Sequence, residues 1–449
     1  MKRTGGEAVV RALEDEGIPC TFGIPGTHNI QLYDALSRSG AVHPVLVTDE
    51  QAASFMADAV WRASGRLGCV NVVPGAGLTH ALSGIAEAWL DNVPLLVLAC
   101  GVRRDSDRAF QLHDVDQMAI AAPVTKAQLR PEDGGDVYGT VRRACRIARD
   151  GAPGPVLVEI PAEHYLFRHR PPEGEGELAS PEGGGPGDHD GAGGEPSPED
   201  PGPFRPSVAR AGGGPRPEEE AVDRAAENLS AASRPLLYVG LGAAGAGGLL
   251  VELAETLESP VSTTFQGKGV FPESHPLWLW PGFGGTAPSF VRSVADGCDA
   301  TLAVGCRFSE VGTGSWSFTP PGPLIHVDVD PRVFDRNFPS RLAVHADARA
   351  FVEALLDRLE GTGGPVRGPD EELRRRMEAG HADVRDEQLG EVRDERVTPA
   401  RLLRELQRAL GPDAVYTTDS GNGTFLALEG LRLDAPGKLL APVDYSSMG

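Results

Sequence analysis

Short runs of consecutive apolar residues alternate with helix-like segments along most of this sequence. In the first third, the apolar runs cover 20–24, 42–47, 68–73, 95–100 and 155–160, and helical patterns separate most of them. A run without polar alternation is typical of a strand that is buried on both faces of a parallel sheet. The order of elements therefore predicts an α/β fold, with a doubly wound parallel sheet in a domain that spans 1–167.

The same pattern returns further along the chain. Apolar runs at 236–239, 260–265, 301–304, 324–329 and 342–345 predict a second, central α/β domain over 218–362. A charged stretch at 363–397 is predicted to be a helical connector, and a third unit begins in 398–449. This last unit is too short to close a parallel sheet of its own, so we expect the chain to be truncated within it.

The segment 168–217 differs from both domains in composition. It is dominated by Gly, Pro and acidic residues, and Phe204 is its single aromatic residue. Such a segment cannot bury enough apolar surface to offset the entropy that it would lose on ordering. We therefore expect a disordered linker between the two α/β domains.

The charge balance excludes two classes of partner. The chain carries 42 Lys+Arg against 64 Asp+Glu, a formal net charge of −22, which disfavours nucleic acid and anionic membrane surfaces. Its six cysteines form no C-x-x-C pair, and no apolar run reaches the roughly 20 residues of a membrane span. We expect a cytoplasmic protein with small-molecule substrates.

Glu50 is placed where a predicted strand ends and a helix begins. Ligand sites in open α/β sheets lie at the carboxyl ends of strands, so a carboxylate here could exchange a proton with a bound heterocycle. The alternative is structural: Asp49 caps the helix and Glu50 stabilises its positive end. Position in the sequence alone favours the structural interpretation.

Glycine turns and histidines give weaker signals. Turns at 23–26, 74–77 and 240–245 each follow a predicted strand, and the last matches G-x-G-x-x-G. No carboxylate ends the next strand, so tight packing of a helix on its sheet is a better interpretation than a dinucleotide fingerprint. His113 lies in the loop after 95–100 and is either a proton carrier or a solvated residue, whereas His80 reads as structural.

Several short motifs occur in a specific order along the chain. They are Phe22-Gly23-Ile24-Pro25-Gly26, Asp49-Glu50-Gln51, Pro74-Gly75-Ala76-Gly77, Phe110-Gln111, Gly267-Lys268-Gly269, His326-Val327-Asp328-Val329-Asp330, Asp419-Ser420-Gly421 and Ser446-Ser447-Met448-Gly449. This ordered set resembles the thiamine diphosphate-dependent enzymes, and most closely the large subunit of acetolactate synthase. The resemblance covers nearly the whole chain except the predicted linker.

The resemblance implies a role for each matched position. Glu50 would hydrogen-bond the aminopyrimidine of thiamine diphosphate and favour the tautomer that removes the thiazolium proton, which reverses the structural interpretation given above. Gln111 would face the substrate side, with His113 as a further catalytic candidate. The cofactor-binding candidates are Pro25, Gly26, Gly75, Gly77, Gly421, Asn422 and Met448.

The resemblance also implies an activity, with departures. We expect a 2-oxo-acid decarboxylase/carboligase of acetolactate synthase type, active in branched-chain amino acid biosynthesis as a homodimer or homotetramer. The family holds Mg²⁺ through Gly-Asp-Gly and a later Asn, but the sequence contains no Gly-Asp-Gly, so no metal ligand is assigned in this chain. FAD is left open. The alternatives are a simple 2-oxo-acid decarboxylase, a 2-hydroxyacyl-CoA lyase, or a catalytically silent regulatory homologue.

Overall fold

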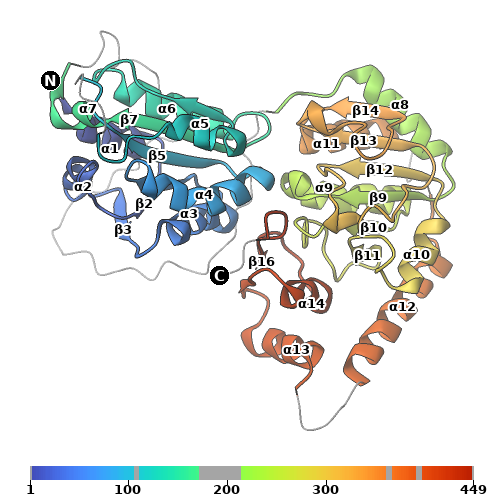
Figure 1. Ribbon diagram of the computed structural model, residues 1–449. Helices are drawn as coiled ribbons and strands as arrows, with labels where there is room; N and C mark the ends of the chain where they lie inside the picture. Colours follow the sequence, from blue (N-terminus) through green and yellow to red (C-terminus); the bar gives the residue numbers. More distant parts are fainter. Residues whose placement is uncertain (1–2, 106–110, 171–213, 361–366, 391–396, 447–449) are drawn as a thin grey trace, which may run out of the picture.

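A computed structural model describes residues 3–105, 111–170, 214–360, 367–390 and 397–446. Figure 1 shows two α/β bodies side by side, with the C-terminal segment packed beneath the second body. Most of the predicted linker, and Met448, lie outside the described residues. Among the described helices, none is both long and apolar enough to cross a lipid bilayer.

The N-terminal domain is built on a six-stranded parallel sheet with the order β3-β2-β4-β5-β7-β6. Its strands are β2 (Cys20–Gly23), β3 (His43–Leu46), β4 (Gly68–Val72), β5 (Leu95–Gly101), β6 (Ala127–Leu129) and β7 (Pro155–Pro161). Its helices are α1 (Gly5–Asp15), α2 (Ile30–Leu36), α3 (Glu50–Ser64), α4 (Ala76–Leu90), α5 (Gln117–Ala121), η1 (Ala122–Val124), α6 (Val137–Arg149) and α7 (Ala162–Leu166). Separate apolar clusters form on the two faces of the sheet, as a doubly wound fold requires.

Two details of this domain correct the sequence analysis. Arg168 and His169 do not begin the linker, because they form β8 (Arg168–His169), which pairs antiparallel with β1 (Arg3–Thr4). This pairing rests on backbone hydrogen bonds, which amino-acid composition does not reveal. The sixth strand, β6, was not predicted, because its three residues are only half-buried and give no apolar run.

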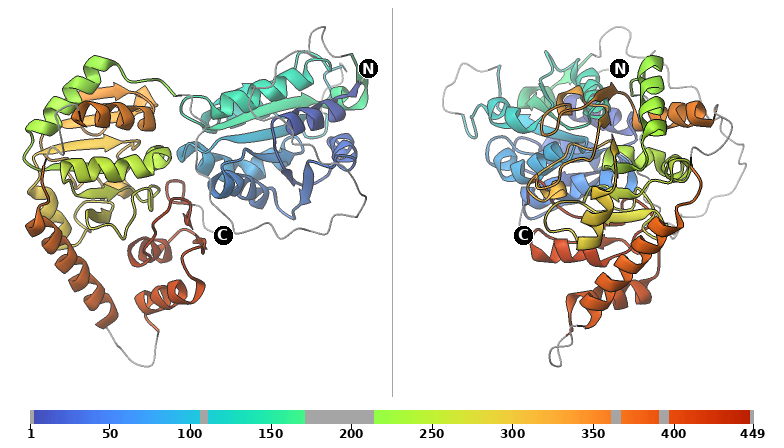
Figure 2. Two further views of the ribbon diagram at one scale, coloured as in Figure 1. Left: turned by 180° about the vertical axis from the view of Figure 1, so that it is seen from behind. Right: turned by 90° about the vertical axis from the view of Figure 1, so that its right-hand side faces the viewer.

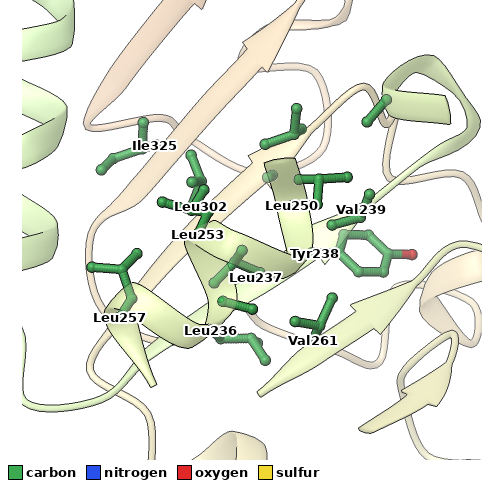
Figure 3. Packing of buried hydrophobic residues seen from close by; sticks show 14 of the residues in the cluster. Leu236, Leu237, Tyr238, Val239, Leu250, Leu253, Leu257, Val261, Leu302 and Ile325 are labelled. Carbon is green, nitrogen blue, oxygen red and sulfur yellow. The ribbon is translucent and has the colours of Figure 1, made fainter. Parts of the chain in front are cut away.

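The central domain repeats the architecture, with the strand order β11-β10-β9-β12-β13-β14 and parallel pairing throughout. Its strands are β9 (Pro235–Val239), β10 (Val261–Thr263), β11 (Trp278–Pro281), β12 (Ala300–Val304), β13 (Leu324–Asp328) and β14 (Leu342–His345). Its helices are α8 (Glu219–Ala231), η2 (Leu241–Ala246), α9 (Gly247–Leu257), α10 (Ser289–Asp296), η3 (Val311–Thr313), η4 (Pro331–Val333), α11 (Ala348–Glu360) and α12 (Glu371–Gly390). Figure 3 shows Leu250, Leu253 and Leu257 of α9 packed over the sheet.

The C-terminal segment contains α13 (Pro399–Leu410), β15 (Tyr416–Thr417), α14 (Asn422–Gly430) and β16 (Leu439–Leu440), with β15 and β16 paired in parallel. A buried ion pair of the central domain, between Lys268 and Glu273, holds the backbone of this segment. Both views of Figure 2 show the segment next to the central domain. Lys268 Nζ donates to both Glu273 oxygens at 2.8 Å and to the carbonyl of Leu431 at 2.9 Å. Glu273 in turn accepts from the Leu433 N–H at 3.0 Å.

The N-terminal domain meets the rest of the chain through a polar contact. Arg62 of α3 donates to Asp91 at 2.7 Å, and Gln266 of the central domain donates to the same Asp91 oxygen at 2.8 Å. Arg307, which follows β12, pairs with Asp444 of the C-terminal segment at 2.8 Å. The three parts of the chain therefore converge at one place, beyond the carboxyl ends of the central strands.

Candidate active site

Glu50 is the first residue of α3, directly after the turn that follows β3. Asp49 provides the cap, because its side chain accepts from the Gln51 N–H at 3.0 Å. Glu50 is only 9% exposed, and its Oε2 lies 3.4 Å from Nδ1 of His80 on α4. With the cap already supplied by its neighbour, the Glu50 carboxylate is available for chemistry at the ends of the strands.

The predicted glycines are closely packed on the side of this carboxylate. A Cβ on Gly26 would lie 2.6 Å from one methyl of Val73, and a Cβ on Gly77 would lie 2.8 Å from the other. The Gly77 position is also 3.4 Å from Glu50 Oε1. Gly75 has a φ of +62°, which favours glycine. These contacts leave no room for a side chain at Gly26 or Gly77 beside Glu50.

The turn that holds Pro25 and Gly26 is fixed by Asn29. The Gly26 N–H donates to Asn29 Oδ1 at 2.7 Å, and the Asn29 amide donates to the Ile24 carbonyl at 3.2 Å. Pro25 itself is exposed. The structure therefore brings Pro25, Gly26, Gly75 and Gly77 to the same end of the sheet as Glu50, as predicted.

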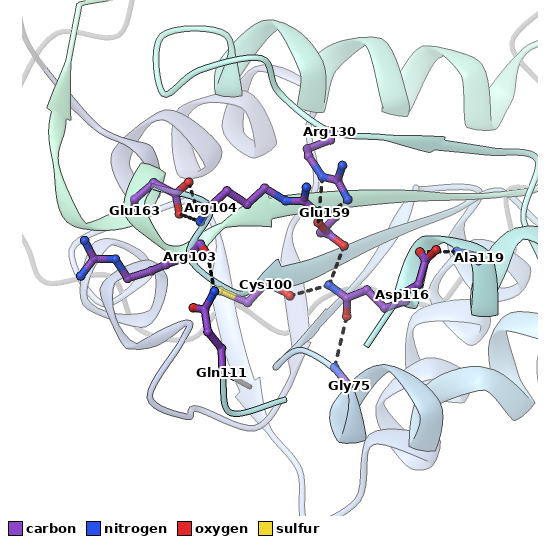
Figure 4. A network of polar contacts seen from close by, with 11 residues as sticks. Gly75, Cys100, Arg103, Arg104, Gln111, Asp116, Ala119, Arg130, Glu159 and Glu163 are labelled. Carbon is purple, nitrogen blue, oxygen red and sulfur yellow. Dashed lines mark hydrogen bonds and ion pairs between the residues drawn. The ribbon is translucent and has the colours of Figure 1, made fainter. Parts of the chain in front are cut away.

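The loop after β5 contributes His113 to the site, and the loop after β2 contributes His28, which the sequence analysis missed. The ring of His113 meets that of His28 edge-on at 5.5 Å, and the His113 carbonyl closes over Gly75. Burial, and then the neighbouring His113, lower the pKa of His28. Gln111 is held differently, because its amide donates to the Arg103 carbonyl at 2.8 Å (Figure 4).

A buried amide ties the Gly75 turn to the sheet. Gln117 donates to the Cys100 carbonyl at 2.8 Å and to Glu159 at 3.0 Å, and it accepts from the Gly75 N–H at 3.3 Å. Arg130 pairs with Glu159 at 2.7 Å and completes the network in Figure 4. Sequence reasoning missed Gln117, because α5, at five residues, is too short to show a helical period.

The structure does not bring Gly421 and Asn422 to Glu50. Gly421 has a φ of +131°, and no atom lies within 4 Å of the position that its Cβ would take. Asn422 begins α14 and is exposed. The ring of Phe425 on α14 contacts Phe265 at 6.0 Å, so this helix belongs with the central domain, apart from α3 in Figure 1.

Asp49, Glu50 and His80 also have the spacing of a metal site within the described part of the chain, since their ligand atoms lie within 4.8 Å of one another. Two observations weigh against a metal here. Asp49 and His80 are exposed, and one Asp49 oxygen already caps α3. The group fits proton exchange at Glu50 better than metal binding.

Comparison with known proteins defines the class of protein. Residues 3–120 match the thiamine pyrophosphate enzyme N-terminal TPP binding domain, and residues 222–355 match the central domain of the same enzymes. Thiamine pyrophosphate is thiamine diphosphate under another name. Together with the relatives below, which match nearly the whole of this chain, these matches show that the chain belongs to the thiamine pyrophosphate-dependent enzyme family.

Curated relatives cover nearly all of the chain. It is 33% identical to a probable 2-ketoarginine decarboxylase of Pseudomonas aeruginosa, over 99% of this chain and 73% of the relative. It is 30% identical to a probable acetolactate synthase large subunit of Methanocaldococcus jannaschii, over 99% and 71%. It is 29% identical to the acetolactate synthase isozyme 3 large subunit of Escherichia coli, over 99% and 73%. The predicted enzyme class and fold are confirmed.

Proposed function

We propose that this protein is a thiamine diphosphate-dependent 2-oxo-acid decarboxylase/carboligase of acetolactate synthase type. The observation that carries the proposal is the buried Glu50 carboxylate, which lies beside Gly77 at the carboxyl ends of the strands. When bound, the cofactor supplies a thiazolium carbon that attacks the substrate carbonyl and accepts the electron pair released with CO₂.

The residues of the chain would divide the work around that cofactor. Glu50 holds and exchanges a proton with the aminopyrimidine ring, and its burial keeps that proton out of bulk water. Gly26 and Gly77 carry no side chain, so in this proposal their backbone approaches the ring directly. His113 lies next to Gly75, and its ring meets that of His28. In this proposal their ring nitrogens can hold a proton beside a 2-oxo acid.

Mg²⁺ and the diphosphate belong to the other end of the cofactor in this proposal. Gly421 and Asn422 offer backbone N–H groups and one amide, but no carboxylate of the kind that Mg²⁺ prefers. These residues fit a contact with the diphosphate and do not by themselves fit the metal. We therefore assign no Mg²⁺ ligand in this chain.

A second copy of the chain is part of the proposal, as a homodimer or homotetramer. Large apolar side chains of the N-terminal domain are exposed, among them Met56 at 44%, Val115 at 49% and Ile120 at 39%. A second chain that covered this domain would remove them from water. Light scattering on the purified protein measures the assembly directly. A cytoplasmic location and a role in branched-chain amino acid biosynthesis remain predictions.

The simple decarboxylase is the second candidate, favoured by the relative named for 2-ketoarginine. Two substrates separate the alternatives. A carboligase converts pyruvate into acetolactate and CO₂, whereas a simple decarboxylase releases CO₂ and an aldehyde from pyruvate or from 2-ketoarginine without forming a new C–C bond. Quantifying both products from each substrate decides between them.

Glu50→Gln tests the proposed chemistry. The amide keeps the size of the side chain but cannot exchange the proton, so turnover should fall by roughly 10²–10⁴-fold. Exchange of the thiazolium C–H for deuterium, followed by NMR with thiamine diphosphate and Mg²⁺, measures the proton step itself. Glu219→Gln is the matched control. Glu219 is also the first residue of a helix, but that helix, α8, belongs to the central domain and not to the Glu50 site. Exchange at the unmutated rate in Glu50→Gln would refute the assignment.

A further inference from the structure

His80 connects the Glu50 carboxylate to the surface of the protein. It lies on α4, three residues after Gly77, and its Nδ1 is 3.4 Å from Oε2 of Glu50 on the adjacent helix α3 (Figure 1). The Glu50 side chain is 11% exposed, whereas that of His80 is 66% exposed. The pair therefore joins a buried carboxylate to an imidazole that is open to water.

The two oxygens of Glu50 face different neighbours. Oε1 lies 3.4 Å from the position that a Cβ on Gly77 would take, and Oε2 is the oxygen next to His80. Asp49 is a third charged group here, with a carboxylate oxygen within 4.8 Å of the ligand atoms of both. Asp49 is exposed and caps α3 with one oxygen, so the charge of Glu50 is less screened by water than that of Asp49.

Tyr33 of α2 is a further titratable group whose charge bears on Glu50. Burial and then the nearby Cys69 raise the pKa of the Tyr33 hydroxyl, and the Glu50 carboxylate adds to this effect. Tyr33 therefore stays neutral at physiological pH. Histidine, by contrast, is the side chain that changes its charge between pH 5 and 8, and His80 is the histidine in contact with Glu50.

A positive charge on His80 and a proton on Glu50 oppose one another. A protonated imidazole at 3.4 Å stabilises the bare carboxylate, and a bare carboxylate has no proton to give to a ring nitrogen. A neutral imidazole removes that preference, so Glu50 can take up a proton and pass it on. The charge on His80 therefore shifts the balance between the two forms of Glu50.

We propose that His80 is a positioning residue that acts through Glu50. Protonation of its imidazole holds Glu50 as an ion-paired carboxylate and slows the exchange of a proton with the cofactor. The inference rests on the proposed function, because it requires that Glu50 exchange a proton with thiamine diphosphate. It gives His80 a part in the chemistry, where the sequence predicted a structural role.

Two variants at this position test the effect of the charge. His80→Gln is neutral and His80→Lys is positive throughout the range in which histidine titrates, and both new residues suit a helix. Exchange of the thiazolium C–H for deuterium is measured at about pH 5.5 and about pH 8. On acidification the parent should lose roughly three- to tenfold more of its rate than His80→Gln, as expected for a pair with one exposed member. His80→Lys should be slower than His80→Gln by a similar factor at both pH values.

His43→Gln is the matched control, because His43 is an exposed histidine at the first residue of β3, at the opposite end of that strand from Glu50. Its pH profile should follow that of the parent. His28 and His113 are present in every variant, so any pH dependence that they cause cancels from the comparison. The same ratio of rates in the parent and His80→Gln, or equal rates in His80→Gln and His80→Lys, would overturn the proposal once thermal unfolding shows that each variant is folded.

A measurement without the cofactor tests the contact itself. The NMR signal of the His80 imidazole, assigned by its absence from His80→Gln, reports the charge on the ring in the unloaded protein. At about pH 6, the ring should carry less positive charge in Glu50→Gln than in the parent, and the same charge in Glu219→Gln. An unchanged signal in Glu50→Gln would also overturn the proposal.

The two hypotheses fail in different ways. Deuterium exchange at the unmutated rate in Glu50→Gln would refute the proposed function. Loss of exchange in Glu50→Gln, together with parent-like pH profiles in both His80 variants, would refute the role of His80 alone.

Discussion

The Lys268–Glu273 pair makes a prediction about how the C-terminal segment is attached. Its two side chains are 2% and 0% exposed, so neither charge is shared with water. Burial lowers the pKa of Lys268 and raises the pKa of Glu273, and the opposite charge of the partner limits each shift. Each charge is therefore tolerable only while the other is present.

Lys268→Met removes one partner and keeps the length of the side chain. Glu273 would lose both 2.8 Å bonds and keep only the Leu433 N–H, while the Leu431 carbonyl would lose its donor. Removing one member of a buried pair costs about 3–5 kcal/mol. Most of this loss should appear as release of the segment that carries Leu431 and Leu433 from the central domain.

Two assays measure that release. Hydrogen exchange should rise in residues 398–446 before it rises in the central sheet. Tryptophan fluorescence during urea unfolding reports the same event, because Arg432 lies over the ring of Trp278 at 4.4 Å and leaves with the segment. Both signals should change at lower urea in Lys268→Met than in the parent protein.

The double variant Lys268→Met/Glu273→Leu separates the charge effect from the packing effect. Only the Leu431 carbonyl and Leu433 N–H remain without their side-chain partners, so the loss should fall short of the sum of the two single losses by roughly 1–3 kcal/mol. Arg349→Met, in an exposed pair with Glu353, should cost less than about 1 kcal/mol. A loss below about 1 kcal/mol for Lys268→Met, or strict additivity in the cycle, would refute this reasoning.

Further predictions concern Glu87 and Gly77. Burial, followed by the nearby Asp91, raises the pKa of Glu87 from 4.5 to about 8. The folded protein then keeps a proton that the unfolded chain releases, so stability should fall between about pH 5 and 8, and Glu87→Gln should flatten the pH profile of the thermal midpoint. Gly77→Ala places a Cβ 2.8 Å from Val73, so it should cost about 1–3 kcal/mol and weaken thiamine diphosphate binding measured by calorimetry. Gly248→Ala, a helical position with open space around it, should instead stabilise by about 0.5–1 kcal/mol.

The strands show which parts of a fold a sequence can reveal. β4, β5 and β7 are buried along their whole length and are apolar apart from Asn71 and Glu159, and these strands were predicted. β11 is also buried along its length but was not predicted, so burial alone does not make a strand evident in the sequence. β6 is half-buried and β8 has two residues, and neither was predicted. Both form because a neighbouring strand offers backbone groups to pair with, which is a property of the folded sheet.

The candidate active site shows the same division. Glu50 and the glycines beside it are candidates from the sequence, because their positions follow from where strands end and from an ordered set of motifs. His28 and Gln117 were not, since His28 matters only through its contact with His113, and Gln117 only through its bond to Gly75. Contacts between residues this far apart in the chain are set by how the loops fold over the sheet.

The sequence by itself therefore determined the class of fold and the family, and it predicted that Glu50 follows a strand at the start of a helix, because burial and turn chemistry leave local patterns. Tertiary structure decided how the shared features are used. The G-x-G-x-x-G turn packs against Gly305, and Arg62 and Arg307 are neutralised by Asp91 and Asp444. Whether an N–H or a cation remains free for a ligand depends on what the folded chain places beside it, and no local pattern records that.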